Sequence, residues 1–562
     1  MLFNSYIFIF LFLPLCLIGF YILQNKQATL AKVWLTCFSL WFYGYFNQYY
    51  LLIMLCSIIG NYLIHGWIVS ERKSPCGCKD NTLLDDYANN DKGGYKQKNR
   101  SWNKSKIVLI TGVILNLLVL FYFKYFDFFV ENVNAVFGSS FSLKHILLPL
   151  GISFFTFQQI SFLVDTYRGE LEQYGRTSEV QNMKSVSDAS EPVSFIDYAL
   201  FVSFFPQLIA GPIVVHEEMM PQFARIGNDK RSREEKVTLF TKGVYVFTLG
   251  LAKKVLIADT FGVAVDLAYS NVNGINGMES LFTIIFYALQ IYFDFSGYCD
   301  MAKGIAGMFG MKIANNFNSP YKAVNIVDFW KRWHITLSRF FTKNIYIPLG
   351  GNRKGEGRMY LNYLIVFFLS GLWHGAGWNF ILWGMMHSML YVATKWWLNR
   401  KKTGVIKKDF FGFDLNEKAV AKKGNWKSSM FKAIACLGTF VYVSVAWVYF
   451  RASSVEQANT LIRNIFNQPW ALPGSGFTDA FNLGEFWYVL KILKVATLPY
   501  ANYYIMILFS IFALAITFWG KNIDELAEKF KPTVLNAVIT AVLFIWCVVS
   551  LSGVSTFLYF NF

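Results

Sequence analysis

The sequence has little charge for its length. Only 15% of its 562 residues are Asp, Glu, Lys or Arg, whereas 55% are hydrophobic and 19% are aromatic. A soluble protein carries about 25% charged residues, so a soluble globular fold is disfavoured. Apolar runs of about 20 residues, the length that crosses a hydrocarbon core, recur from end to end. The composition therefore predicts an all-α, polytopic integral membrane protein.

Acidic residues are the scarcer of the two charge types, with 35 Asp and Glu against 52 Lys and Arg. In a soluble protein this balance would suggest a nucleic-acid partner. Here the excess falls in hydrophilic stretches between apolar runs, notably residues 71–106 and 301–358. That distribution is typical of cytoplasmic segments of a membrane protein and suits contact with anionic lipid. We therefore expect membrane lipid, and no nucleic acid, among the partners.

Cysteine is sparse, and its pattern excludes two kinds of site. The eight cysteines are scattered, and Cys76 and Cys78 form a C-x-C with no second pair nearby. A disulfide framework and a zinc site are both disfavoured, so we expect no metal. The N-terminus also lacks a basic region and a small-residue cleavage site, so it is expected to form the first membrane helix rather than a cleaved signal.

The apolar runs predict about twelve transmembrane helices, with re-entrant or amphipathic helices at the inner face. Residues 1–170 are expected to hold the N-terminal helices, residues 195–397 a catalytic core, and residues 398–562 the C-terminal helices and an aromatic tail. Pro206 and the pair Gly211-Pro212 should break the run at 195–215 into a hairpin. The absence of a fixed repeat disfavours inverted-repeat transporters.

Two histidines stand in unusual surroundings. His374 lies in the apolar segment SGLWHGAGW, where an imidazole is costly unless it meets a partner, a cavity or a reaction. The flanking glycines would let backbone or a ligand approach, and a neutral imidazole could act as a general base. The structural alternative is a hydrogen bond between helices. The remaining histidines have no such company and are expected to be structural: His65, His145, His216 and His387.

His334 lies in the basic, aromatic segment DFWKRWHITLS. At helical spacing, Trp330, His334 and Ser338 would share one face. His334 could orient a substrate or assist proton transfer, and the alternative is an interfacial histidine in an aromatic belt. The neighbouring cations could hold a phosphate-bearing donor. We expect five residues to bind that donor: Lys331, Arg332, Arg339, Asn352 and Arg353.

Three further segments carry weaker signals. Asn352 and Arg353 belong to GGNRKG, which lacks the spacing of a P-loop and could equally be a tight turn. Asp294 and Asp300, in FDFSGYCDMAKG, lie near a membrane boundary and need partners, for which Lys303 is a candidate. The last residues, FLYFNF, include Tyr559, whose alternative reading is an aromatic-belt tyrosine.

Between residues 195 and 386 the sequence closely resembles the membrane-bound O-acyltransferase (MBOAT) superfamily. Within it, the match is to the membrane subunit of alginate O-acetyltransferases and to their peptidoglycan and exopolysaccharide relatives. The segments that carry the resemblance are FFPQLIAGPI, LQIYFDFSGYCDMAKG, NFNSPY, FWKRWHITLS, YIPLGGNRKG and GLWHGAGWNFILWG. Weaker similarity extends to the N-terminus and to the FLYFNF tail.

The resemblance implies the MBOAT fold around a central funnel, and acetyl transfer from cytoplasmic acetyl-CoA to an extracytoplasmic polysaccharide. It maps the catalytic histidine of the family onto His374 and the second functional histidine onto His334. It also makes Tyr559 a candidate acyl carrier. The implied partner is an extracytoplasmic transferase of the SGNH-hydrolase type, and the implied location is the bacterial cytoplasmic membrane. The alternatives are acylation of a lipid or protein, as in other branches, or a proton-coupled transporter that uses the histidines as relays.

Overall fold

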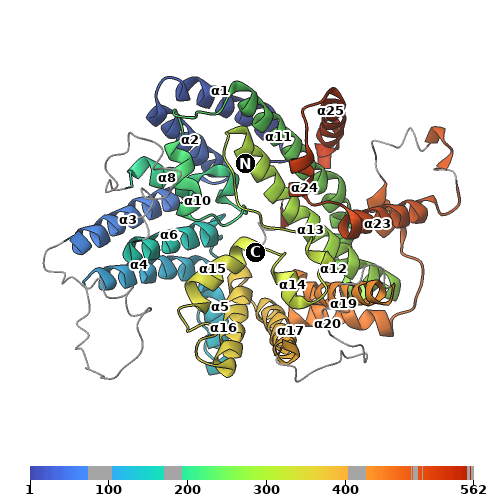
Figure 1. The fold of residues 1–562 in the computed structure, drawn as a ribbon. Coiled ribbons are helices and arrows are strands. Elements are labelled where there is room, and N and C mark those ends of the chain that lie inside the picture. Colours follow the sequence, from blue (N-terminus) through green and yellow to red (C-terminus); the bar gives the residue numbers. More distant parts are fainter. Residues whose placement is uncertain are drawn as a thin grey trace. The chain divides into compact units, whose positions relative to one another are not determined.

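The computed structural model describes residues 1–73, 104–169, 193–402, 426–482, 484, 491–495, 498–553 and 557–558. Every regular element within these residues is helical (Figure 1), which confirms the predicted all-α class. Tyr559 and the pair Cys76 and Cys78 lie outside the described residues, as does most of the predicted hydrophilic segment 71–106.

The chain forms two compact units. One consists of Gly19–Ile209 and Val214–Asp229, and the other of Met1–Ile18, Ala210–Ile213 and Lys230–Phe562. We call them the smaller and the larger unit. Helix α1 (Leu13–Gln24) crosses the boundary between them. The smaller unit contains the helices α2 (Ala28–Gly44), α3 (Gln48–Lys73), α4 (Lys104–Leu120), η4 (Phe121–Tyr125), α5 (Phe126–Phe137), α6 (Ile152–Arg168), α8 (Phe195–Ser203), α9 (Phe205–Leu208) and α10 (His216–Ala224).

The larger unit begins with η1 (Phe8–Phe12) and resumes with α11 (Arg233–Ala252), η6 (Lys253–Ala258), α12 (Asp259–Ser270), η7 (Val272–Gly274) and α13 (Gly277–Met308). Short helices follow: η8 (Pro320–Lys322), α14 (Ile326–Trp330), α15 (Ile335–Phe341) and η9 (Thr342–Tyr346). The remaining helices are α16 (Glu356–His374), α17 (Trp378–Lys402), α19 (Trp426–Arg451), α20 (Val455–Asn467), α21 (Ser475–Thr478), η10 (Asp479–Phe481), α23 (Ala501–Trp519), α24 (Ile523–Lys529), α25 (Val534–Val549) and η13 (Ser550–Gly553).

Several helices have the length and apolar composition of membrane spans. Within the described residues, five reach at least 18 residues with high hydropathy: Gln48–Arg72, Lys104–Phe137, Gly277–Met308, Ser429–Arg451 and Ala501–Trp519. Two apolar helices are shorter, Phe8–Gln24 and Val534–Val549. All seven lie in apolar runs of the sequence, which supports a multi-pass membrane protein. The total of twelve stays a prediction.

The predicted break around Pro206 is present in the smaller unit. Helix α8 ends at Ser203, and α9 is a separate helix of 4 residues that contains Pro206. The backbone N–H of Phe205, freed by the break, donates to the Ser39 hydroxyl of α2 at 3.2 Å. Interrupted backbone inside an apolar protein needs such partners, because water is not there to satisfy it.

Helix α13 is the central element of the larger unit. It has 32 residues, so it is about 48 Å long. Asn276 and Glu279 form a capping box at its start. Glycines let α11 approach it closely: a Cβ at Gly304 would lie 2.5 Å from the backbone nitrogen of Phe247, and one at Gly250 only 2.6 Å from that of Met301. Small residues at such contacts are typical of helix pairs in membranes.

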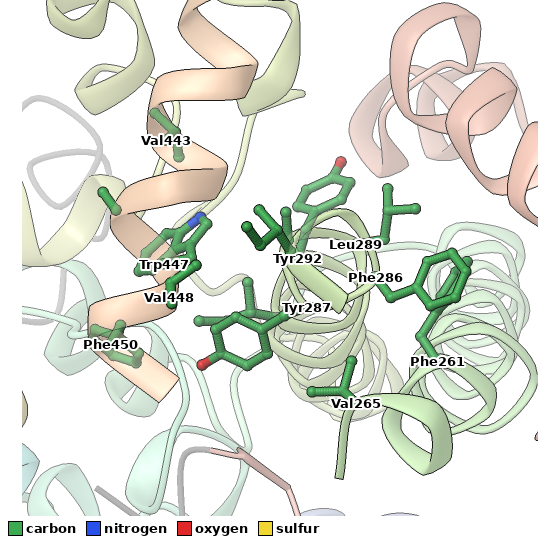
Figure 2. Close-up of a cluster of buried hydrophobic side chains, with 14 of the residues drawn as sticks. Phe261, Val265, Phe286, Tyr287, Leu289, Tyr292, Val443, Trp447, Val448 and Phe450 are labelled. Carbon is green, nitrogen blue, oxygen red and sulfur yellow. The ribbon is translucent and has the colours of Figure 1, made fainter. Parts of the chain in front are cut away.

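Aromatic and aliphatic side chains of α13 fill the space toward α12 on one side and α19 on the other (Figure 2). Phe286 of α13 lies 5.0 Å from Phe261 of α12, ring centre to ring centre. On the opposite side, Trp447 of α19 donates its indole N–H to the Tyr321 hydroxyl at 3.1 Å, and that hydroxyl donates to the backbone oxygen of Ala288 on α13. This core fixes α19, whose last turn contributes to the site described next.

Candidate active site

His374 is the last residue of α16, at the turn that leads into α17. Glycines make the turn tight: a Cβ at Gly371 would lie 2.4 Å from the backbone oxygen of Phe380, and one at Gly375 would lie 2.1 Å from the Phe380 ring. Asn379 fixes the turn to α19 by donating to the backbone oxygens of Tyr449 and Ala452. The glycines predicted to admit backbone or a ligand thus admit a neighbouring helix.

The His374 side chain is surrounded by aromatic rings. Its imidazole lies 5.0 Å from the ring of Phe450 on α19, 5.1 Å from Trp383 on α17 and 4.8 Å from Trp373. Only 5% of the residue is exposed. Because these rings are apolar and rigid, they hold the imidazole in one place and exclude bulk water from it.

His334 does not lie on a continuous helix, so the predicted common face with Trp330 and Ser338 is wrong. Helix α14 ends at Trp330, and His334 precedes α15 as its N-cap in the left-handed conformation, with φ 45° and ψ 52°. A non-glycine residue there costs about 1 kcal/mol or more, so the surroundings must enforce it. The left-handed turn accompanies a wholly buried side chain.

Asn316 determines which nitrogen of His334 carries the proton. The Thr336 hydroxyl accepts the backbone N–H of Ile213 and donates to Asn316 Oδ1 at 2.9 Å. His334 Nδ1 lies 3.1 Å from the same oxygen. Since a carbonyl oxygen only accepts, Nδ1 carries the hydrogen and Nε2 the lone pair. His334 lies outside the long apolar helices, and burial lowers its pKa to about 3, so the imidazole is neutral at ordinary pH.

The two predicted histidines lie together in the larger unit. Their ring centres are 6.3 Å apart, with an angle of 61° between the planes. His334 also packs edge-to-face on Phe295 of α13, at 4.9 Å. Two imidazoles at this spacing can act on the same group of a substrate. One can accept its proton as a base, and the other can orient it through a hydrogen bond.

A cavity of about 530 Å³ lies in the same unit, lined mainly by α14, α15, η9, α16 and α17, and neither histidine of the pair is among its lining residues. Its walls are mostly apolar, and it reaches Ser370, which lies one helical turn before His374 on α16. Three cations line it: Lys331, Arg339 and Lys343. A mostly apolar space with cations along its lining suits a molecule that has both phosphate groups and an uncharged arm.

The structure brings only some of the predicted donor-binding residues to this cavity. Lys331 and Arg339 line it, whereas Arg332 forms an ion pair with Asp328 at 2.9 Å. Asn352 and Arg353 are not among its lining residues. Lys343 was missed by the sequence reasoning, although it lies four residues after Arg339, the spacing that places both on one helical face. Asn316 was also missed, because nothing in its spacing marks it as the partner of His334.

The buried acids of α13 have partners other than the predicted Lys303. Asp294 pairs with Lys254 at 2.7 Å, and Asp300 pairs with Lys253 at 2.6 Å. Lys303 instead contacts Asp524 of α24. The lysines come from η6, which the sequence order places 40 and more residues earlier. Each buried charge thus has the opposite charge it requires.

Of the histidines expected to be structural, His387 and His65 have hydrogen-bond partners within the protein. His387 Nδ1 accepts the indole N–H of Trp330 at 3.3 Å, and His65 lies 3.0 Å from the Thr166 hydroxyl. In the smaller unit His216 lies 3.3 Å from Asp165, and with Glu217 they form a group whose ligand atoms all lie within 4.8 Å of one another. The expectation of no metal stays a prediction.

Comparisons with known proteins connect this geometry to an enzyme class. The family model described as MBOAT, membrane-bound O-acyltransferase family, matches residues 133–411. The peptidoglycan O-acetyltransferase of Helicobacter pylori is 40% identical over 473 residues, which cover 83% of this chain and 80% of that protein. The probable alginate O-acetylase of Pseudomonas aeruginosa is 33% identical over 471 residues, 83% of this chain and 75% of that protein. The teichoic acid D-alanyltransferase of Bacillus subtilis is 27% identical over 252 residues, 43% of this chain and 57% of that protein.

The fold is that of a multi-pass helical membrane protein, and its larger unit holds a buried histidine pair and a cation-lined cavity that reaches α16, the helix that ends at His374. The chain belongs to the membrane-bound O-acyltransferase family, as the sequence motifs predict, and it is an acyltransferase.

Proposed function

We propose that the chain is an O-acetyltransferase of a bacterial cytoplasmic membrane. It takes acetyl groups from cytoplasmic acetyl-CoA and passes them outward for O-acetylation of an extracytoplasmic polysaccharide. The names of its relatives, a peptidoglycan O-acetyltransferase and alginate O-acetylases, support a polysaccharide acceptor. A catalytic core at residues 195–397, flanked by helices at 1–170 and 398–562, belongs to the same proposal.

The observation that carries the proposal is the enclosed pair of His334 and His374, with 6.3 Å between ring centres, in a chain of this family. A thioester is already an activated acyl donor, so the protein must mainly position the reactants and accept a proton. A neutral imidazole among aromatic rings can do both. His374 is assigned as the general base and His334 as the residue that orients the reacting group.

The cavity supports acetyl-CoA as the donor. Lys331, Arg339 and Lys343 would hold its phosphates, and the apolar walls would hold the uncharged arm that ends in the thioester. Ser370 marks the part of the cavity one helical turn from His374. Arg332, Asn352 and Arg353 remain donor-binding residues in this proposal. They would contact acetyl-CoA as it arrives from the cytoplasm, outside the cavity.

The reaction balances without a metal. The oxygen of an acceptor hydroxyl, that of Tyr559 in this proposal, attacks the carbonyl carbon of the thioester as its proton passes to the imidazole of His374. A C–O bond forms, the C–S bond breaks, and the departing thiolate takes the proton to leave as free coenzyme A. The acetyl group is then handed to a partner transferase of the SGNH-hydrolase type outside the membrane, which esterifies a sugar hydroxyl.

The test is transfer of labelled acetyl from acetyl-CoA by the purified chain in vesicles. His374→Ala should lower the turnover number by about 10²- to 10⁴-fold, the range for loss of a general base. His65→Asn is a matched control, because it replaces another buried imidazole and should leave turnover within about twofold. Near-normal turnover of a folded His374→Ala chain would remove the proposed base.

A further inference from the structure

Phe557 and Leu558, which we call the C-terminal tail, are held by a buried ion-pair cluster on α13 and η6. The backbone N–H of Leu558 donates to Asp294 Oδ2 at 3.1 Å, while Asp294 Oδ1 accepts from Lys254 at 2.7 Å. The side chain before it, Phe557, lies 1% exposed. Its ring meets Tyr298 edge-to-face at 4.8 Å, and the Lys254 ammonium lies 4.7 Å from its centre.

The charges of this cluster favour a chain segment whose backbone N–H can donate a hydrogen bond to Asp294. Lys254 also pairs with Asp259 at 2.7 Å, so one ammonium stands between two carboxylates. The second oxygen of Asp294 therefore needs a further donor, because a carboxylate out of water is costly unless its acceptor sites are filled. The Leu558 amide supplies that donor, and a charge-assisted hydrogen bond of this kind is stronger than a neutral one.

The tail and His334 contact α13 at the same turn. Asp294 and Tyr298, four residues apart, share the face that holds the tail. Phe295 and Cys299 lie about 100° further around the helix. Phe295 packs on His334, and Cys299 accepts from Asn316, the partner of His334. One helical turn thus fixes both the tail and the imidazole.

We propose that Asp294, Lys254 and Tyr298 form the docking site for the chain's own C-terminal tail and act as positioning residues for Tyr559, the residue after Leu558. The positioning of Tyr559 rests on the proposed function, in which Tyr559 carries the acetyl group. The docking of the tail does not rest on that function, because it is a binding equilibrium between the tail and α13. Releasing the tail would leave the donor cavity intact while removing the acceptor hydroxyl from its place.

The test uses the full-length chain in detergent, treated with a carboxypeptidase and followed by intact mass. Asp294→Ala should remove the hydrogen bond to the tail, while Lys254 keeps Asp259 as its partner. We expect loss of Leu558 and Phe557 to become at least tenfold faster. Asp300→Ala is the matched control, since it removes another buried carboxylate of α13 that pairs with the neighbouring lysine, Lys253. Its release rate should match that of the unsubstituted chain.

A second variant keeps the test independent of folding of the helical core. Phe557→Ala changes only the tail, removes both ring contacts and should also speed release. If both Asp294→Ala and Phe557→Ala release the tail at the unsubstituted rate, docking at this site is wrong. Equal acceleration by Asp300→Ala would contradict it as well, because the effect would then be a general loosening of α13.

Labelled acetyl on the C-terminal peptide separates the two proposals. In Asp294→Ala we expect the labelled fraction to fall at least tenfold with an unchanged KM for acetyl-CoA, which a general structural defect would not produce. If the unsubstituted chain never carries label on the tail, Tyr559 is not the carrier, yet faster release would still establish the docking site. If Asp294→Ala carries as much label on its tail as the unsubstituted chain and releases the tail no faster, the docking proposal fails and the carrier role stands.

Discussion

His334 Nδ1 lies 3.1 Å from Asn316 Oδ1, so a residue 18 positions earlier fixes the tautomer of a buried imidazole. The contact leaves the lone pair on Nε2. It also links the ring to Thr336, whose hydroxyl donates to the same oxygen. The arrangement resembles the way in which enzymes hold a histidine by a hydrogen bond to its other nitrogen.

Asn316→Leu should therefore lower turnover with little change in the KM for acetyl-CoA. The substitution removes the acceptor that holds Nδ1–H, so the imidazole can adopt the wrong tautomer, and we expect a loss of about tenfold or more. Steady-state kinetics of labelled acetyl transfer measures it. Asn316→Asp, which keeps an acceptor oxygen, should retain more activity than Asn316→Leu. The reverse order would contradict the proposed role.

The burial of His334 predicts an acid-sensitive fold. Its pKa falls to about 3 from an ordinary value near 6.5, so the unfolded chain binds a proton that the folded chain does not. Stability from this group is complete above pH 6.5 and falls by about 1.4 kcal/mol per pH unit as the pH decreases toward 3. His334→Gln should thus lose less Tm between pH 6.5 and 5 than the unsubstituted chain. The exposed His145→Gln is the control. Equal losses of Tm in all three chains would refute the assignment.

The parts of this molecule that the sequence predicts are the local ones. Apolar runs locate the seven apolar helices, and Pro206 locates a helix break, because both depend on residues next to each other. The contacts of His374 do not follow from spacing, since Phe450 lies 76 positions later and arrives through packing of α19. The predicted pairing of Asp300 with the nearby Lys303 failed for the same reason: helix packing brings Lys253 closer.

The tight turn that carries His374 predicts that one added methyl group at Gly371 lowers stability. In Gly371→Ala the new Cβ would lie 2.4 Å from the backbone oxygen of Phe380, and backbone gives way less readily than a side chain. We expect a loss of about 1–3 kcal/mol in stability, the range for overpacking, together with reduced turnover. Thermal unfolding in detergent measures the first effect. Gly438→Ala is the matched control: outside its own stretch of helix backbone, no atom lies within 4 Å of an added Cβ, so helix propensity should make it neutral or slightly stabilising. Similar losses in both variants would contradict the packing argument.

Chelation should leave acetyl transfer unchanged. Base catalysis on an activated thioester needs no metal, and the group of Asp165, His216 and Glu217 belongs to the smaller unit, whereas His374 belongs to the larger one. Dialysis against a chelator followed by the labelled-transfer assay tests the expectation. If chelation removes the activity, zinc restores it in the unsubstituted chain, and zinc fails to restore it in Asp165→Asn, this group is instead a metal site.

The cavity predicts which cations act on donor binding. Lys331 lines it, whereas Arg332, the next residue, is held by Asp328. Lys331→Gln should raise the KM for acetyl-CoA about three- to tenfold, with a smaller change in the turnover number, because it removes a contact to a phosphate made equally in the ground and transition states. The effect should shrink as salt is added, since exposed charges are screened within about 10 Å at 0.1 M.

Arg332→Gln tests whether the donor binds in the cavity lined by Lys331. It removes the same charge one residue away, and its effect on KM should be smaller than that of Lys331→Gln. Arg463→Gln, on the exposed face of α20, controls for the loss of a positive charge anywhere on the chain. If Arg332→Gln raises KM more than Lys331→Gln does, the donor approaches along another surface. The cavity next to Ser370 would then have to be reassigned, even if His374 remains the base.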